Sequence, residues 1–135
     1  MPLTLTTHDT RFDDPDPLTI AKVLSSLDGD RNVIAALERS EAEYLHAEGS
    51  AGAGLALEYQ DGTIDRRYRC RAGALPVDRV SAIFQAYAQG GDAWRDGLEW
   101  DHVPYVTPAV PWFSTWWGYI LALVAVAALI WWWRG

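Results

Sequence analysis

The side chains that could carry chemistry in this chain are scattered along the sequence. Its three histidines, His8, His46 and His102, lie far apart, and Cys70 is the only cysteine. A single cysteine excludes an internal disulfide and a cysteine-based metal cluster, and the separated histidines do not form a spaced ligand motif. We therefore predict no metal site.

Carboxylates are numerous, and two groups of them could bind a cation or act as acids and bases. The run Asp13-Asp14-Pro15-Asp16 lacks the spaced oxygen ligands of a calcium loop, so we interpret it as a solvated turn and helix cap. The second group lacks a pocket motif. It comprises Glu38, Glu41, Glu43, Glu48 and Glu58. The glycine-rich stretch 49–54 lacks the lysine and the following helix of a phosphate-binding loop. We predict a non-enzymatic protein with no catalytic residues and no small-molecule substrate.

Four arginines close together, Arg66, Arg67, Arg69 and Arg71, form a local basic stripe on a chain of formal net charge −7. One interpretation is cross-strand pairing with Glu58 and neighbouring acids. The other is docking to an acidic partner surface, because arginine is enriched in protein interfaces. The acidic balance of the whole chain argues against nucleic acid as a partner, because neutralising phosphates requires a basic surface.

The hydrophobic patterning predicts that an α+β domain over residues 1–103 positions these side chains. Asp16 caps a helix that begins at Pro17 and continues to about Gly29. A second helix is expected from Pro76 to Gly90, and a short third one from Asp92 to about Leu98.

Four strand-like segments lie between the two main helices. They are Arg31–Leu37, Tyr44–Ala47, Ala53–Gln60 and Thr63–Arg71. The dipeptide Asp61-Gly62 predicts a two-residue hairpin turn between the last two. Alternation then predicts a buried face, made by Leu55, Leu57, Tyr59, Ile64, Tyr68 and Cys70, and an outer face that carries most of the arginine stripe. We expect a small antiparallel sheet of about four strands packed with two main helices.

The C-terminal part of the chain has a different composition. No charged residue occurs from Val103 to Trp133, and a proline-containing linker, residues 104–111, precedes residues 112–133. As a helix, 112–133 would be about 33 Å long, which matches a hydrocarbon core of about 30 Å. Tryptophans that would lie at the two membrane interfaces flank it. These are Trp112, Trp116, Trp117, Trp131, Trp132 and Trp133. We predict one transmembrane helix; the alternative is a buried core helix.

Small residues recur along this predicted helix at Ser114, Gly118, Ala122 and Ala125. Such a stripe lets helices approach closely in lipid, although alanine is also common in any membrane helix. The span contains no His, Cys, Met, Asp or Glu, so it offers no axial ligand for haem or chlorophyll and no proton relay. We expect no cofactor held by its own ligands, and peripheral contact with lipid or pigment.

A resemblance to a known group of domains is carried by three segments, LERSEAEYLHAEG, LALEYQDGTIDRRYR and VDRVSAIFQAYAQGGDAWRDGLEWDHV. Together they resemble a small, largely uncharacterised bacterial α+β domain that is similar to immunity proteins of polymorphic toxin systems. The resemblance covers about residues 18–103 and implies the fold but no catalytic signature. The hydrophobic tail departs from the soluble form usual for such domains.

These observations favour an accessory or structural subunit of a larger integral-membrane complex, which docks through its tryptophan-rich helix. By analogy with assemblies that recruit single-helix aromatic subunits, we expect a photosynthetic reaction-centre or light-harvesting complex, or a respiratory one. The alternative is a membrane-tethered immunity-like or adaptor domain that binds a soluble protein. The N-terminus lacks a secretory signal, so we expect a cytoplasmic domain on the bacterial inner membrane. In this topology Arg134 would lie on the far side of the membrane, which weakly opposes it, because basic residues are usually in excess on the cytoplasmic side.

Overall fold

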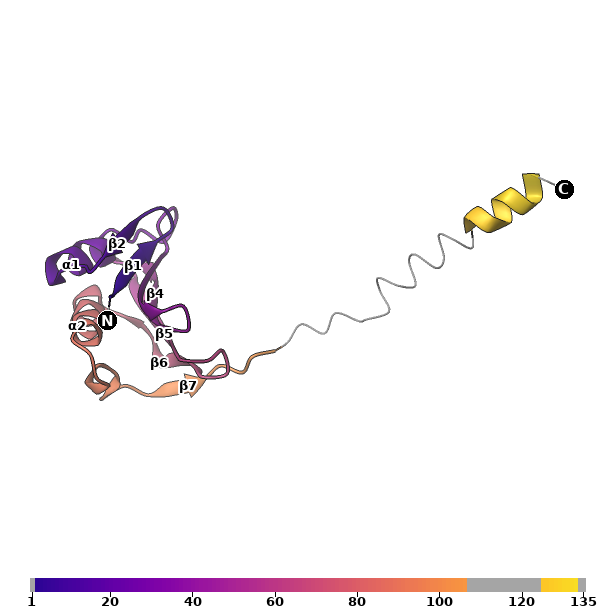
Figure 1. Cartoon of the computed structure of the whole chain (residues 1–135). Helices are drawn as coiled ribbons and strands as arrows, with labels where there is room; N and C mark the ends of the chain where they lie inside the picture. Colours follow the sequence, from indigo (N-terminus) through magenta and orange to yellow (C-terminus); the bar gives the residue numbers. More distant parts are fainter. Residues whose placement is uncertain (1, 107–124, 134–135) are drawn as a thin grey trace. The chain divides into compact units, whose positions relative to one another are not determined.

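The computed structural model describes residues 2–106 and 125–133. The chain divides into two compact units, Met1–Tyr105 and Val106–Gly135. The first unit is an α+β domain whose elements are drawn in Figure 1. In chain order they are β1 (Thr4–Thr7), β2 (Arg11–Asp13), α1 (Pro17–Ser25), β3 (Ile34–Ser40), β4 (Glu43–Ser50), β5 (Gly54–Asp61), β6 (Arg67–Leu75), α2 (Val77–Ala88), the 3₁₀ helix η1 (Ala93–Arg95) and β7 (Trp100–His102).

One seven-stranded sheet runs through this unit in the order β2-β1-β3-β4-β5-β6-β7. All neighbouring strands are antiparallel, so the expected α+β class with an antiparallel sheet is confirmed. The expected number of about four strands is wrong, because β1, β2 and β7 were missed. These strands are only three or four residues long, which is too short for alternation to be visible in the sequence.

The start of α1 is formed as its sequence predicts. The carboxylate of Asp16 accepts a hydrogen bond of 2.7 Å from the backbone N–H of Thr19, and Pro17 occupies the first turn. The helix ends at Ser25, earlier than the expected Gly29. The reason is a turn centred on Asp28, whose carboxylate accepts the backbone N–H groups of three residues, Asp30, Arg31 and Asn32.

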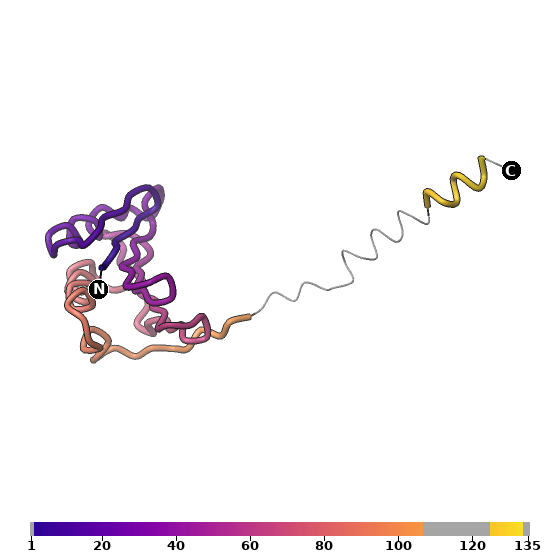
Figure 2. Tube along the Cα trace, in the orientation of Figure 1, coloured from indigo at the N-terminus to yellow at the C-terminus, as the bar shows by residue number. Residues whose placement is uncertain are grey.

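Both α-helices lie on the same side of the sheet, as Figure 1 shows. The apolar side chains of that side form one core with the helices. Its fully buried members include Leu5, Ile20, Leu24, Leu37, Leu45, Leu55, Leu57, Val80, Phe84 and Tyr87. Along the trace in Figure 2, the β1–β2 hairpin lies at one end of the sheet and β7 at the other.

No helix of residues 2–106 covers the opposite side of the sheet, which we call the open face. Because side chains alternate along a strand, this face carries the neighbours of the core positions. On the four central strands it consists mainly of Ala36, Glu38, Tyr44, His46, Glu58, Gln60, Arg67 and Arg69.

The connection between β5 and β6 differs from the expected two-residue turn. Gln60 faces Arg67 across the two strands, so residues 62–66 form a five-residue loop. The N–H of Arg66 donates to the carbonyl of Thr63, which closes the turn inside this loop. Ile64 therefore lies on the loop with 44% of its surface exposed, and its predicted burial is wrong. The predicted burial of Cys70 is confirmed, and β6 extends to Leu75.

The β4–β5 turn depends on glycine at Gly49. Its φ of +132° is unfavourable for other residues, and an added Cβ would lie 2.5 Å from the carbonyl oxygen of Gly54. We expect Gly49→Ala to lower the free energy of unfolding by about 2 kcal/mol. Gly52→Ala is the control, because a Cβ there would meet nothing within 4 Å. Thermal unfolding of the full chain in mild detergent, followed by near-ultraviolet circular dichroism, checks this. Equal melting temperatures of the two variants would contradict it.

The second unit is described only at Val106 and at residues 125–133. Residues 125–133 are helical. Among the described helices, none combines the length and the apolar character needed to cross a bilayer. Most of the predicted span lies outside the described residues. That part includes Ser114, Gly118 and Ala122 of the small-residue stripe and three of the predicted interface tryptophans, Trp112, Trp116 and Trp117.

Candidate functional site

Glu58 occupies the centre of the open face. Only 4% of its surface is exposed, although no helix of residues 2–106 covers this face. Two arginines donate hydrogen bonds to both of its carboxylate oxygens. Arg67 donates to Oε1 from Nε at 3.1 Å and also from Nη2, and Arg69 donates to Oε2 from Nε at 3.3 Å and from Nη2 at 3.1 Å. The buried acid is thus held by four charge-assisted hydrogen bonds.

The strand register explains why these three residues meet. Glu58 lies directly opposite Arg69 across β5 and β6, and Arg67 is two residues away on the same face of β6. The first interpretation of the arginine stripe, cross-strand pairing with Glu58, is confirmed for Arg67 and Arg69, and docking to an acidic partner stays a prediction. The sequence does not indicate that this acid is buried, because its position alternates with the core residues Leu57 and Tyr59.

Electrostatics fix the charge states in this cluster. Burial raises the pKa of Glu58, but the bonds from Arg67 and Arg69 outweigh it and hold that pKa below its ordinary value. His46 Nε2 lies 3.9 Å from Glu58 Oε2. Burial lowers the pKa of His46 despite the nearby carboxylates of Glu58 and Glu48. At neutral pH the cluster therefore combines two guanidinium groups, one carboxylate and a neutral imidazole.

The other two arginines of the stripe also bind carboxylates. Arg71 donates to Glu99 at 2.9 Å and to Asp101 at 2.6 Å, and Arg66 donates to Asp61 at 2.7 Å. Asp101 and Glu99 raise the pKa of Arg71, so this pair of acids keeps it charged. The basic stripe is consequently divided into three ion clusters, and the cluster of Glu58 is the one in which arginines outnumber carboxylates.

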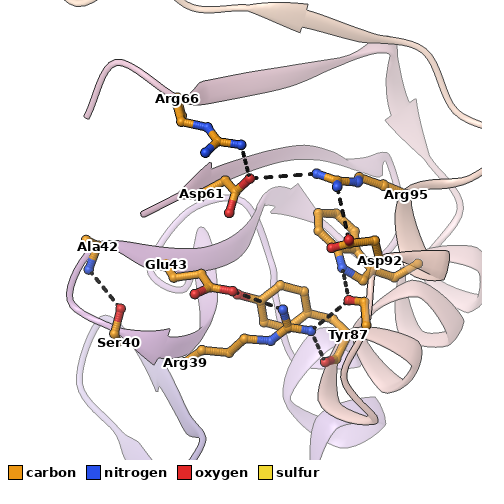
Figure 3. Close-up of polar contacts among 11 residues, drawn as sticks. Arg39, Ser40, Ala42, Glu43, Asp61, Arg66, Tyr87, Asp92 and Arg95 are labelled. Carbon is orange, nitrogen blue, oxygen red and sulfur yellow. Dashed lines mark hydrogen bonds and ion pairs between the residues drawn. The ribbon is translucent and has the colours of Figure 1, made fainter. Parts of the chain in front are cut away.

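A second polar network lies where α2 ends, and Figure 3 shows it. The guanidinium of Arg39, from β3, donates to the carbonyls of Tyr87 and Gly91 at 2.8 and 3.2 Å, and to the carboxylate of Glu43 at 3.0 Å. It also lies 3.9 Å from the centre of the Tyr87 ring. Arg39 thus caps the C-terminal end of α2, where carbonyl groups lack helical partners, and ties that end to the sheet.

Trp94 Nε1 joins η1 to this network by donating to the carbonyl of Gly91 at 3.1 Å, and a second arginine forms ion pairs nearby. Arg95 lies 3.3 Å from Asp92 and 4.0 Å from Asp61, which also binds Arg66 (Figure 3). Within the described residues, the Tyr87 hydroxyl is buried without a hydrogen-bond partner, and burial raises its pKa. Arg39 thus connects β3 to the end of α2, and Arg95 connects η1 to β5. Such bonds make the connection between the sheet and the helices rigid.

The remaining candidates from the sequence stay separate. His102 lies on β7, where a ring nitrogen contacts the carbonyl of Asp65, whereas His46 lies on β4 and His8 is exposed near β1. In the described ranges, no three or more His, Cys, Asp or Glu side chains are placed to hold a metal ion. The polar side chains that do come together form ion pairs with one another. These ion pairs connect strands and helices of the domain with one another.

Comparisons with known proteins identify no relative: the chain matches no protein-family model, no curated protein and no solved structure. The resemblance to immunity domains stays a prediction. Two surfaces bear on function: the open face, with Glu58, Arg67 and Arg69 at its centre, and the exposed helix of residues 125–133.

Proposed function

We propose that the protein is a membrane-anchored, non-enzymatic accessory subunit of a larger integral-membrane complex. The observation that supports this most is the exposure of the helix at residues 125–133. Leu129 and Ile130 are 62% and 54% exposed, and Trp131, Trp132 and Trp133 are 82%, 79% and 92% exposed. An apolar helix of this kind is stable only if lipid or another apolar surface surrounds it.

The uncharged sequence from Val103 to Trp133 extends this apolar character over a length that fits a bilayer. In the proposal, residues 112–133 cross the bacterial inner membrane once, with the N-terminal domain in the cytoplasm. The tryptophans near both ends of that segment would lie at the two interfaces. Ser114, Gly118, Ala122 and Ala125 would let a helix of the partner complex approach closely.

The domain contributes binding rather than chemistry in this proposal. In the Glu58 and Arg39 networks, the clustered charges bind one another. We assign the partner to bioenergetic membrane proteins, either photosynthetic or respiratory, by analogy with single-helix aromatic subunits. Contact with pigment or lipid would be peripheral.

Fractionation of cell membranes tests the anchor. We expect the full chain to stay in the membrane pellet after an alkaline carbonate wash, and a variant without residues 112–133 to be released into the soluble fraction. Recovery of the full chain in the soluble fraction would refute membrane insertion.

Gentle purification tests the complex separately. In mild detergent, we expect integral-membrane subunits to co-purify with the full chain in fixed proportion. Replacing Gly118 with isoleucine should release them, because the larger side chain separates the helices. A chain that is membrane-bound but always purifies without other subunits would leave the anchor standing and overturn the accessory role.

A second candidate function is an immunity-like or adaptor domain that is tethered to the membrane and binds a soluble protein. It is favoured by the position of Arg67 and Arg69 on the open face, where 65% of the Arg69 side chain is exposed. Under this alternative, deleting residues 111–135 leaves partner binding intact. Under the first proposal the same deletion abolishes assembly.

A further inference from the structure

The open face has an ordered distribution of charge across its four central strands. One cross-strand row consists of Glu38, Tyr44, Gln60 and Arg67, from β3, β4, β5 and β6 in turn. The next row consists of Ala36, His46, Glu58 and Arg69 on the same strands. In each row the guanidinium group lies on β6, and in the first row the free carboxylate lies on β3.

The two ends of the first row are available to a partner. Glu38 is half-buried and takes part in no ion pair with residues 2–106, whereas Arg67 is 30% exposed at its side chain. Arg67 and Arg69 share one carboxylate, so the β6 side carries an excess positive charge. Tyr44 and Gln60 lie between these ends, and the Tyr44 ring stacks on that of His46 in the next row at 5.7 Å between ring centres. Aromatic and arginine side chains are both enriched in protein interfaces.

We propose that the open face binds a second copy of this chain in a two-fold dimer, with the axis parallel to the strands and between β4 and β5. This rotation exchanges β3 with β6 and β4 with β5, while each row stays over itself. Glu38 then faces Arg67 of the partner subunit, and Tyr44 faces Gln60 of the partner subunit. His46 similarly faces the partner's Glu58, and every contact occurs twice.

Charge complementarity selects this axis. A two-fold axis perpendicular to the strands would instead place β6 over β6 and bring the excess positive charges together, which costs free energy. An unrelated partner would need the reverse order of charges on its own surface. A second copy supplies that order by symmetry, without any further assumption about the cell.

The size of the face predicts a weak dimer. Four strands spaced about 4.8 Å apart and about seven residues long cover roughly 440 Å² per copy. Stable complexes bury about 800 Å² per partner, so this contact belongs to the weak class. We therefore expect reversible dimerisation that depends on protein concentration.

Sedimentation velocity of the full chain in mild detergent, over a wide concentration range, tests the proposal. We expect a monomer–dimer equilibrium. Glu38→Arg should raise the dissociation constant at least about tenfold, because an attraction that occurs twice becomes a repulsion. Glu41→Arg is the matched control, with the same change of charge at the exposed β3–β4 turn outside the face, and should leave the constant unchanged. A monomer at every concentration, or equal effects of both variants, would overturn the proposal.

A second experiment separates this contact from association through the predicted membrane helix. Gln60→Cys places a single reactive thiol on the open face, because the native Cys70 is buried on the opposite side of the sheet. With sheets about 10 Å apart and strands about 4.8 Å apart, a short bismaleimide should link two copies. Combining this change with Glu38→Arg should reduce the yield, and combining it with Gly118→Ile should not. Cross-linking that is lost with Gly118→Ile and kept with Glu38→Arg would refute the open-face dimer.

Discussion

Replacing Glu58 with alanine is expected to lower the free energy of unfolding by about 3 kcal/mol, which corresponds to roughly 12–24 °C in melting temperature for a domain of this size. The change removes the acceptor of four hydrogen bonds and leaves Arg67 and Arg69 as neighbouring like charges. The loss stays at the lower end of the range for broken buried pairs, because the Arg69 side chain is 65% exposed and turns into water.

The matched control is Glu48→Ala, on the neighbouring strand β4, which removes an exposed carboxylate that takes part in no hydrogen bond with residues 2–106. We expect it to change stability by less than about 0.5 kcal/mol. Thermal unfolding of the full chain in mild detergent, monitored by near-ultraviolet circular dichroism, gives both values. If Glu58→Ala and Glu48→Ala unfold at the same temperature, the cluster does not stabilise the domain.

The pH dependence of the Glu58 effect has a defined sign. The arginines hold the pKa of Glu58 in the folded domain below its ordinary value of 4.5, so the ionised group stabilises the folded state. That contribution is complete above pH 4.5 and is lost as the pH falls below it through the folded-state pKa. The stability difference between the wild type and Glu58→Gln should therefore be constant near neutrality and shrink in acid. A difference that grows in acid would contradict the assignment.

The parts of this fold that were predictable from sequence rest on local chemistry. Asp16 and Pro17 mark the start of α1, because an acidic cap and a proline in the first turn act within one turn of helix. The alternation of Leu55, Leu57 and Tyr59 likewise identifies the core face of β5. Once two neighbouring strands are assigned, the pairing of Glu58 with an arginine on β6 follows from geometry.

The parts that were missed depend on contacts distant in sequence. Asp61-Gly62 was expected to form a two-residue turn, yet residues 62–66 form a longer loop, inside which the N–H of Arg66 donates to the carbonyl of Thr63. This shift moved Ile64 from the predicted core to the surface. Strand β7 forms only because the chain returns to the edge of β6, where Trp100 pairs with Cys70. The sequence around Trp100 contains no alternation of apolar and polar residues that predicts a strand.

The position of Arg39 is the clearest example of information that only the fold supplies. Arg39 lies on β3, 48 residues before Tyr87. Nothing near Arg39 in the sequence predicts that its side chain binds the C-terminal end of α2. We expect Arg39→Met to lower the free energy of unfolding by about 3 kcal/mol. Methionine keeps the packing but removes the charged donor from the carbonyls of Tyr87 and Gly91, which keep their bonds from Gly90 N–H and Trp94 Nε1. It also removes the cation from the Tyr87 ring and leaves Glu43 unpaired.

Two further substitutions make this prediction specific. Arg39→Lys should recover only part of the loss, because an ammonium group cannot bind Glu43 and the two carbonyls with the planar geometry of a guanidinium. Arg79→Met, on the exposed surface of α2, removes the same charge and should shift stability by less than about 0.5 kcal/mol. Amide hydrogen exchange of the full chain locates the effect: the last turn of α2 should lose protection first. Uniform loss of protection across the sheet would show that Arg39 does not act as the cap that connects α2 to β3. A full recovery of stability with lysine would show that Arg39 acts through its charge alone.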